Sequence, residues 1–105
     1  MREINEQLHE LVRRIVIAAN PLRIILFGSF ARGDAGSASD IDVLVVVPDG
    51  VHRRETARNI YRGLEGFPLP VDVVVATVSD LDRYKDSPGL VYREALREGK
   101  ELYAA

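Results

Sequence analysis

Three short apolar runs, each rich in β-branched residues, set the strongest limit on how this chain can fold. They cover residues 24–27, 41–47 (with Asp40 as an alternative first residue) and 71–77, and such runs are typical of buried strands. The connection 28–39 is tight for a parallel crossover, whereas 48–70 leaves room for one with a helix. We therefore predict an antiparallel first pair, a parallel second pair and a mixed sheet of at least three strands.

The segments around these runs repeat apolar side chains at the spacing of amphipathic helices. We expect one helix over residues 2–20, which Pro21 stops, and another over residues 51–64. The second has an apolar stripe formed by Ala57, Ile60, Tyr61 and Leu64. A polar and basic face lies opposite this stripe, so both helices are predicted to pack on the sheet.

Two further helix starts are indicated near the C-terminal end. Ser79 stands three residues before Asp82, which is the spacing of a capping box. Ser87 followed by Pro88 predicts the start of a last helix, which Gly99 is expected to end. With helices packed on a mixed sheet, the predicted fold class is α/β or α+β.

Composition excludes several classes of protein. The 105 residues are expected to form one domain, 1–105, and they hold no cysteine for a disulfide, a thiol nucleophile or a zinc-thiolate site. Lys and Arg number 14 against 16 Asp and Glu, so no extended nucleic-acid-binding surface is expected. No apolar run reaches the roughly 18 residues of a membrane span, and the N-terminus is unlike a signal peptide. We expect a cytoplasmic protein that does not contact a membrane.

The stretch after the first strand has the features of an anion-binding turn. Gly28 stands where a buried strand ends, and a glycine there lets a ligand approach the backbone. Ser29 adds a hydroxyl donor, and the amides of a following helical turn would point toward an anion. Arg32 offers a guanidinium to phosphate oxygens or to a nearby carboxylate. Taken alone, the motif is more typical of an ordinary turn in which glycine serves only for its dihedral angles.

Three aspartates occur in or just before the later strands. Asp40 and Asp42 are two residues apart, so on a strand both point to one face, where they repel unless a cation lies between them. Asp72 interrupts a valine-rich run, where a carboxylate is costly unless it is paired, metal-bound or faces a cleft. If the second and third strands are neighbours, Asp72 stands beside Asp42. This outlines a metal-dependent phosphoryl- or nucleotidyl-transfer site; the alternative is acids at strand ends that face solvent.

Together, these motifs resemble those of a known family. They are Gly28-Ser29-x-x-Arg32-Gly33, Ser39-Asp40-x-Asp42 and, in a later hydrophobic strand, Asp72. The combination resembles the nucleotidyltransferase fold of the DNA polymerase beta superfamily. The short length, the leading helix and the spelling of the glycine motif are most similar to the minimal nucleotidyltransferases. In prokaryotes these are typically encoded beside a HEPN-domain protein, and in several such pairs the nucleotidyltransferase is the antitoxin.

The resemblance implies a catalytic role for the three acids. Asp40 and Asp42 would bind two Mg²⁺ ions, and Asp72 would complete the metal site and help to deprotonate an acceptor hydroxyl. The acceptor would then attack the α-phosphorus of a nucleoside triphosphate, and pyrophosphate would leave. Because all three acids are present, the motif carries no sign of an inactive copy.

The same resemblance implies a set of nucleotide-binding residues. Gly28 and Ser29 would hold the β- and γ-phosphates of the nucleoside triphosphate. Arg32 and Ser39 are further candidates on the nucleotide side of the site. For Arg32 two roles stay open, since it would either orient the loop through aspartates or touch phosphate.

A partner protein is the expected acceptor. In related antitoxins AMP is transferred from ATP to a tyrosine of the HEPN toxin, which becomes inactive. Larger members carry a C-terminal helical domain that binds base or acceptor, whereas only about thirty residues follow the third strand here, so we expect another protein or self-association to supply that part. The alternative is a non-catalytic antitoxin that neutralises its partner by occlusion. A resistance enzyme that modifies a small molecule is a weaker third reading, because it would need a separate helper domain.

Overall fold

The three β-branched runs form neighbouring strands of one sheet in the computed structural model, which describes residues 2–36, 38–87 and 91–105. The strands are β1 (Arg23–Phe27), β2 (Ile41–Val47), β3 (Val71–Thr77) and β4 (Lys100–Ala104), arranged in the order β3-β2-β1-β4. β1 is antiparallel to β2 and to β4, whereas β2 and β3 are parallel. The predicted antiparallel and parallel pairs are both confirmed.

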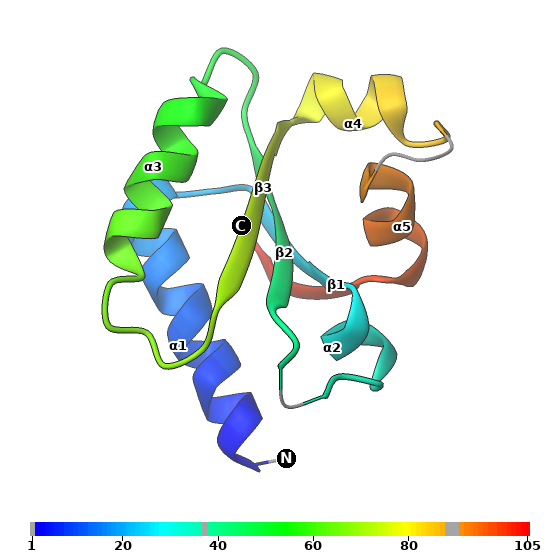
Figure 1. The fold of residues 1–105 in the computed structure, drawn as a ribbon. Coiled ribbons are helices and arrows are strands. Elements are labelled where there is room, and N and C mark those ends of the chain that lie inside the picture. Colours follow the sequence, from blue (N-terminus) through cyan, green and yellow to red (C-terminus); the bar gives the residue numbers. More distant parts are fainter. Residues whose placement is uncertain (1, 37, 88–90) are drawn as a thin grey trace.

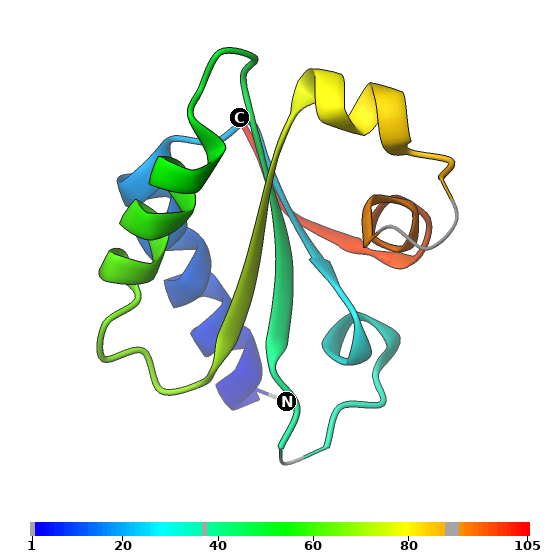
Figure 2. The same ribbon diagram turned by 45° about the horizontal axis from the view of Figure 1, so that its top comes forward.

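Helices cover the two faces of this sheet (Figures 1 and 2). They are α1 (Arg2–Ala19), α2 (Ser29–Arg32), α3 (Arg53–Gly63), α4 (Val78–Tyr84) and α5 (Val91–Glu98). α1 and α3 lie side by side on one face, α4 and α5 lie on the other, and α2 forms a single turn beyond the end of β1 (Figure 1). None of these helices, within the part of the chain that the structure describes, combines the length and hydrophobicity needed to cross a bilayer.

Side-chain alternation along β2 divides the core between the two helical layers. The odd-numbered residues from Ile41 to Val47 pack with Leu11 and Ile15 of α1 and with Ile60 of α3. The even-numbered Leu44 and Val46 belong to the second cluster, with residues of α4 and α5. Because both faces are covered, β2 is apolar on both, as the sequence indicates. By the same alternation Asp42 points to the face that α4 and α5 cover.

β4 is a strand that the sequence analysis does not assign. It follows Gly99 directly and pairs with β1 along the outer side of the sheet. A β-carbon on Gly99 would lie 2.9 Å from the carbonyl oxygen of Leu26 and collide with Ile25, so only glycine lets the chain pass this close to β1. Leu102 and Tyr103 are half-buried against the core. This strand therefore depends on a contact between residues far apart in the sequence.

The start of α4 corrects one prediction. Thr77, and not Ser79, caps the helix: its hydroxyl accepts a hydrogen bond from the Asp80 amide, and the Asp80 carboxylate accepts one from the Thr77 amide. Ser79 is inside the first turn and donates hydrogen bonds to Asp49 from its amide and its hydroxyl. The capping box is thus shifted by two residues because β3 runs directly into the helix.

Two other helix predictions differ in detail. α3 begins at Arg53, and His52 caps it by accepting a hydrogen bond from the Glu55 amide. Tyr61 is not part of the buried stripe: its side chain is 46% exposed, and its hydroxyl accepts a hydrogen bond from the amide of Val73 at the open edge of β3. The predicted helix start at Ser87-Pro88 falls partly on residues 88–90, which lie outside the described residues.

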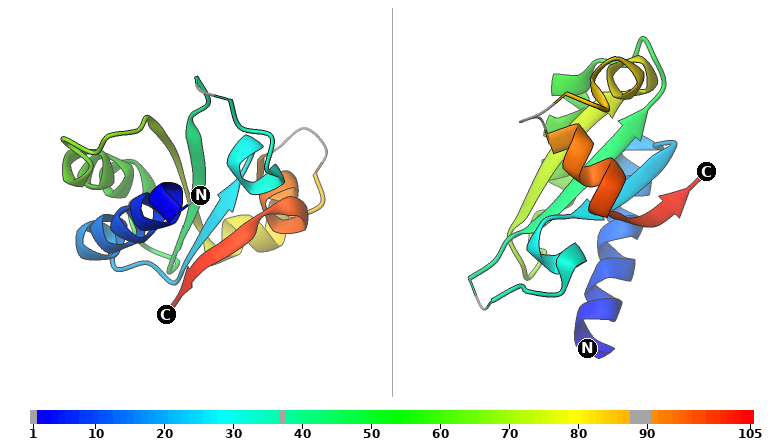
Figure 3. Two further views of the ribbon diagram at one scale, coloured as in Figure 1. Left: turned by 90° about the horizontal axis from the view of Figure 1, so that it is seen from below. Right: turned by 90° about the vertical axis from the view of Figure 1, so that its right-hand side faces the viewer.

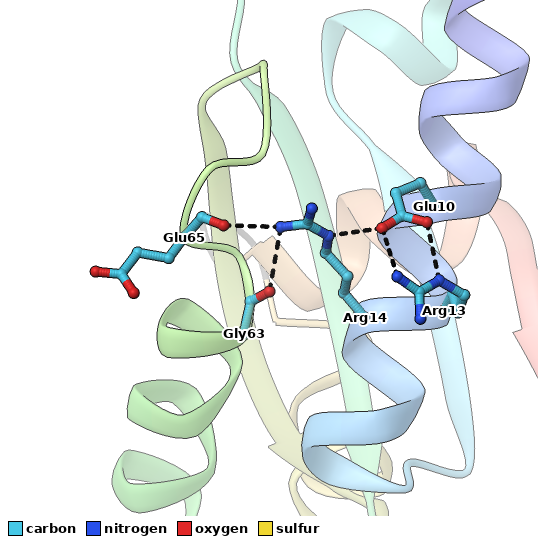
Figure 4. A network of polar contacts seen from close by, with 5 residues as sticks. All are labelled: Glu10, Arg13, Arg14, Gly63 and Glu65. Carbon is cyan, nitrogen blue, oxygen red and sulfur yellow. Dashed lines mark hydrogen bonds and ion pairs between the residues drawn. The ribbon is translucent and has the colours of Figure 1, made fainter.

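A polar network ties α1 to the end of α3 (Figure 4). The Arg14 guanidinium donates to the carbonyl oxygens of Glu65 at 2.9 Å and Gly63 at 3.4 Å, and it lies over the Phe67 ring. These carbonyls belong to the last turn of α3 and the loop beyond it, where a cation is favourable. Glu10 accepts hydrogen bonds from Arg13 and from Arg14. These hydrogen bonds, the one from Arg13 first, lower the pKa of Glu10 to about 2.

We predict that Arg14→Ala lowers the free energy of unfolding by about 1–2 kcal/mol, because the backbone carbonyls lose a charged donor. Among the described residues Arg13 pairs with Glu10 alone, on the exposed side of α1, so Arg13→Ala is the matched control and should change the free energy of unfolding much less than Arg14→Ala does. Urea denaturation of the three proteins measures both effects. Equal losses for the two variants would contradict the proposed tie between α1 and α3.

Candidate active site

The residues that the motifs single out meet at one end of the sheet. Phe27, the last residue of β1, lies opposite Asp42, which in turn lies opposite Asp72 of β3. This end is the lower one in Figure 1, where β1 passes into α2 and where β2 and β3 begin; Figure 3 (left) looks onto it. Neighbouring strands are about 4.8 Å apart, so the two carboxylates stand side by side on the face of α4 and α5. The predicted neighbourhood of Asp42 and Asp72 is confirmed.

Gly28 lets the backbone and the Asp42 carboxylate approach each other closely. Its φ of 75° and ψ of −156° belong to a region that only glycine adopts without strain. A β-carbon on Gly28 would collide with a carboxylate oxygen of Asp42 and lie 3.2 Å from its Cγ. The glycine therefore serves for more than its dihedral angles, because it leaves the space that the carboxylate occupies.

Gly28 also begins the turn that the sequence analysis assigns to phosphate. Gly28 is the N-cap residue of α2 and has no side chain that could compete with a ligand for the first amides of the turn. The amides of Ala31 and Arg32 donate to the Gly28 carbonyl, and Ser29 is half-buried at the first helical position. Ser29 and the opening of this turn therefore lie directly beside Asp42.

Negative charge is concentrated around Asp42. Burial raises the pKa of Asp42 above its ordinary value, and the carboxylates of Asp72, Asp40 and Glu94 raise it further, while Arg32 acts in the opposite direction. Asp42 is half-buried, whereas Asp40 and Asp72 are exposed. Asp40 and Asp72 are thus close enough for their charges to act on Asp42, which is the arrangement that a cation relieves.

The acids fit a metal ion that takes only part of its ligands from the protein. In the part of the chain that the structure describes, no three His, Cys, Asp or Glu side chains are arranged so that they could hold a metal ion by themselves. Mg²⁺ is usually bound by one or two carboxylates and completed by substrate phosphates and water. Asp42 and Asp72 lie side by side with Asp40 nearby, next to a turn suited to phosphate, and they match that requirement.

Ser39 and Arg32 are both engaged with the protein itself. The Ser39 hydroxyl accepts a hydrogen bond from the Gly36 amide at 2.9 Å, which closes the turn before Asp40. Arg32 Nε lies 3.3 Å from a carboxylate oxygen of Asp34, and its Nη1 lies 3.6 Å from one of Glu94. Two roles are open for Arg32, a contact with carboxylates that orients the loop and a contact with phosphate. In this structure Arg32 contacts carboxylates.

Glu94 is a residue at this site that the sequence analysis does not identify. It lies on α5, far along the chain from the motifs, and belongs to none of them. Its charge nevertheless acts on Asp42, and its carboxylate pairs with Arg32. The sequence contains no signal for this position, because only the packing of α5 beside α2 brings Glu94 to the site.

Comparison with known proteins identifies the family. The model of a family described as a nucleotidyltransferase domain matches residues 1–101. The chain belongs to this nucleotidyltransferase family. The resemblance drawn from the glycine and aspartate motifs is confirmed, and so is the assignment of the chain as a nucleotidyltransferase.

Individual proteins similar to this nucleotidyltransferase share a limited part of its sequence. A Methanocaldococcus jannaschii protein, provisionally named a protein adenylyltransferase, is 36% identical over 56 residues, which are 53% of this chain and 56% of that protein. The matched part thus spans little more than half of that relative. A solved structure from Sulfolobus solfataricus, provisionally named a nucleotidyltransferase, aligns with a TM-score of 0.63 at 22% identity, over 94% of this chain and 78% of the other.

A third similarity is to a toxin–antitoxin complex. The complex holds a tri-AMPylated HEPN toxin of Shewanella oneidensis together with an MNT antitoxin. One of its chains aligns with a TM-score of 0.50 at 22% identity, over 100% of this chain and 74% of the other. At these identities the likeness to both solved structures establishes the fold, and it confirms the predicted mixed sheet with helices packed on it.

We predict that Gly28→Ala lowers the free energy of unfolding by more than the roughly 1–3 kcal/mol of backbone strain, because the new methyl group also displaces the Asp42 carboxylate. In an Asp42→Ala background the same substitution should cost only the strain. Gly33→Ala is the control: Gly33 also has a positive φ, of 82°, but its β-carbon would meet nothing within 4 Å. Denaturant unfolding of the wild type, of Gly28→Ala, Asp42→Ala and Gly33→Ala, and of the Gly28→Ala, Asp42→Ala double variant measures these costs. A cost of Gly28→Ala that does not depend on Asp42 would contradict the close approach.

Proposed function

We propose that this nucleotidyltransferase transfers AMP from ATP to a hydroxyl group of a partner protein and so acts as the antitoxin of a HEPN-domain toxin. The observation that carries the proposal is the pairing of Asp42 with Asp72 in register, directly beside the turn at Gly28. A carboxylate pair next to open backbone amides suits a triphosphate with its counter-ions.

The donor nucleotide binds between the turn and the acids in this proposal. The first amides of α2 and the Ser29 hydroxyl hold the β- and γ-phosphates, and Arg32 lies one turn further on. Asp40, Asp42 and Asp72 would hold the Mg²⁺ ions. When bound, these ions neutralise charge on the phosphates and on the departing pyrophosphate. Because negative charge is in excess around Asp42, this region attracts an anionic substrate only when cations are bound there.

The transfer itself makes one phosphorus–oxygen bond and breaks another. The acceptor oxygen attacks the α-phosphorus, the bond from that phosphorus to the β-phosphate oxygen breaks, and pyrophosphate leaves. The hydroxyl proton goes to Asp72, which is the most suitable base because it is exposed and stands beside Asp42 at the open edge strand. Asp42 is half-buried and packed against Gly28, so its carboxylate has a fixed position and suits the role of a metal ligand better than that of a base.

The names of similar proteins support the choice of group and acceptor. The M. jannaschii relative is named for adenylyl transfer to protein, and the S. oneidensis complex joins an AMPylated HEPN toxin to an MNT antitoxin. AMP is therefore the group, and a HEPN-domain protein the acceptor, that we propose for this chain. A partner protein also supplies the acceptor-recognition surface that larger nucleotidyltransferases carry on a helical domain.

The test is a transfer reaction with α-labelled ATP, Mg²⁺ and, as acceptor, the product of the gene adjacent to the one for this chain, which we expect to be a HEPN-domain protein. We predict labelling of that protein, and a loss of at least about a hundred-fold in the rate for the Asp40→Asn, Asp42→Asn double variant, the scale expected when stabilisation of developing charge is removed. Asp82→Asn is the control, because Asp82 is an exposed acid on α4 and should leave the rate unchanged.

The alternative of occlusion gives different results in the same system. If the double variant still binds the partner and still suppresses its toxicity, the chain neutralises the toxin by binding alone and the proposed transfer is wrong. If the double variant binds the partner but no longer suppresses toxicity, neutralisation requires the reaction. Labelling that persists in the double variant would also overturn the assignment of Asp40 and Asp42.

A further inference from the structure

Arg32 is held by carboxylates from two separate segments. Asp34 lies two residues further along the same loop and pairs with the guanidinium at 3.3 Å. Glu94 comes from α5 and pairs with it at 3.6 Å. All three side chains are about half exposed or more, so water and other anions can reach the pair. The Arg32–Glu94 pair links α2 to α5, which lie next to each other on the right-hand side of Figure 1.

This ion pair lies beside the acids of the active site. The charges of both Arg32 and Glu94 act on Asp42, with opposite effects on its pKa. α5 covers the sheet face to which Asp42 points, since Ala95, the residue after Glu94, is buried in the same cluster as Leu44. Glu94 is therefore a fourth carboxylate near the three motif acids, and among the described residues it has a guanidinium within ion-pair distance whereas those three acids have none.

A triphosphate would compete with these carboxylates for Arg32. Guanidinium groups bind phosphate and carboxylate oxygens through the same fork of N–H donors. A nucleotide whose β- and γ-phosphates lie at the turn of Gly28 and Ser29 brings several anionic oxygens to the start of α2, one turn from Arg32. Exposed ion pairs are weak, so an exchange of partners is accessible without unfolding either helix.

We propose that Glu94 is a resident counter-ion that competes with the nucleotide for Arg32: it pairs with Arg32 beside the phosphate-binding turn, and the β- and γ-phosphates of a bound triphosphate replace its carboxylate with their own oxygens. The inference rests on the proposed function, since it assumes a nucleoside triphosphate at that turn. It adds a counter-ion, contributed by α5, that a nucleotide must displace. Ligands without β- and γ-phosphates do not displace it.

The experiment measures dissociation constants of ATP and of AMP, each with Mg²⁺, by isothermal titration calorimetry on the full chain. We expect Glu94→Gln to tighten ATP binding by about two- to five-fold, the size of an exposed ion pair, because the competing carboxylate is removed. AMP binding should not change. Glu98→Gln is the control, since Glu98 is exposed one turn further along α5 and should alter neither constant.

A double-mutant cycle tests whether Glu94 acts through Arg32. In an Arg32→Gln background the effect of Glu94→Gln on ATP binding should disappear, because no guanidinium remains to exchange. The difference between wild type and Glu94→Gln should also shrink at high salt, which a purely structural role for Glu94 would not produce. Equal effects of Glu94→Gln on ATP and AMP, or an effect that persists without Arg32, would overturn the inference.

The outcomes separate this inference from the proposed function. If the wild-type chain binds ATP and Glu94→Gln leaves the constant unchanged or weakens binding while the variant stays folded by circular dichroism, only the inference is wrong. If the wild-type chain binds no nucleotide under conditions in which it is folded, the proposed function and the inference are both overturned.

Discussion

The register between β1, β2 and β3 is the constraint on which the rest of the site depends. Asp42 lies opposite Phe27 on one side and Asp72 on the other, so a single residue of β2 sets both the distance to the glycine turn and the pairing of the acids. A shift of one residue would turn Asp42 toward the core of α1 and α3 and bring a valine or isoleucine to the site. The continuous burial of the rest of β2 opposes such a shift, because the strand is held by apolar packing on both faces.

Packing and chemistry make opposite demands at this end of the sheet. The core favours apolar residues on β2 and β3, yet Asp42 is half-buried among them and its pKa is raised by burial and by neighbouring acids. Gly28 gives the carboxylate the room that it needs, and Arg32 is the cation that acts against the surrounding negative charge. Placing Asp42 near other acids therefore costs electrostatic free energy, and the apolar packing of the rest of the sheet offsets this cost. Such a balance is common where a protein binds charged ligands.

Much of this arrangement could be predicted from local sequence. The β-branched runs predict three strands, the lengths of the two connections predict their directions, and the aspartates at the strand starts predict a shared site. The prediction was wrong where neighbouring elements decide a boundary. Thr77 replaces Ser79 as the cap of α4 because β3 ends there, and Tyr61 turns to the open edge of β3 instead of the core. β4 has no local signal, since its five residues are stabilised by pairing with β1 and by packing on the core, and these contacts lie far from it in the sequence.

By itself the sequence determined the strands β1, β2 and β3, the helices that pack on them, the order of the motifs and the family, because these depend on residue type and spacing along the chain. Only the tertiary structure decided that Asp42 lies over Gly28 and that Glu94 reaches Arg32. The physical reason is distance along the chain. Along the chain Glu94 is separated from Arg32 by β2, α3, β3 and α4, and no local pattern records a contact that arises when α5 packs beside α2.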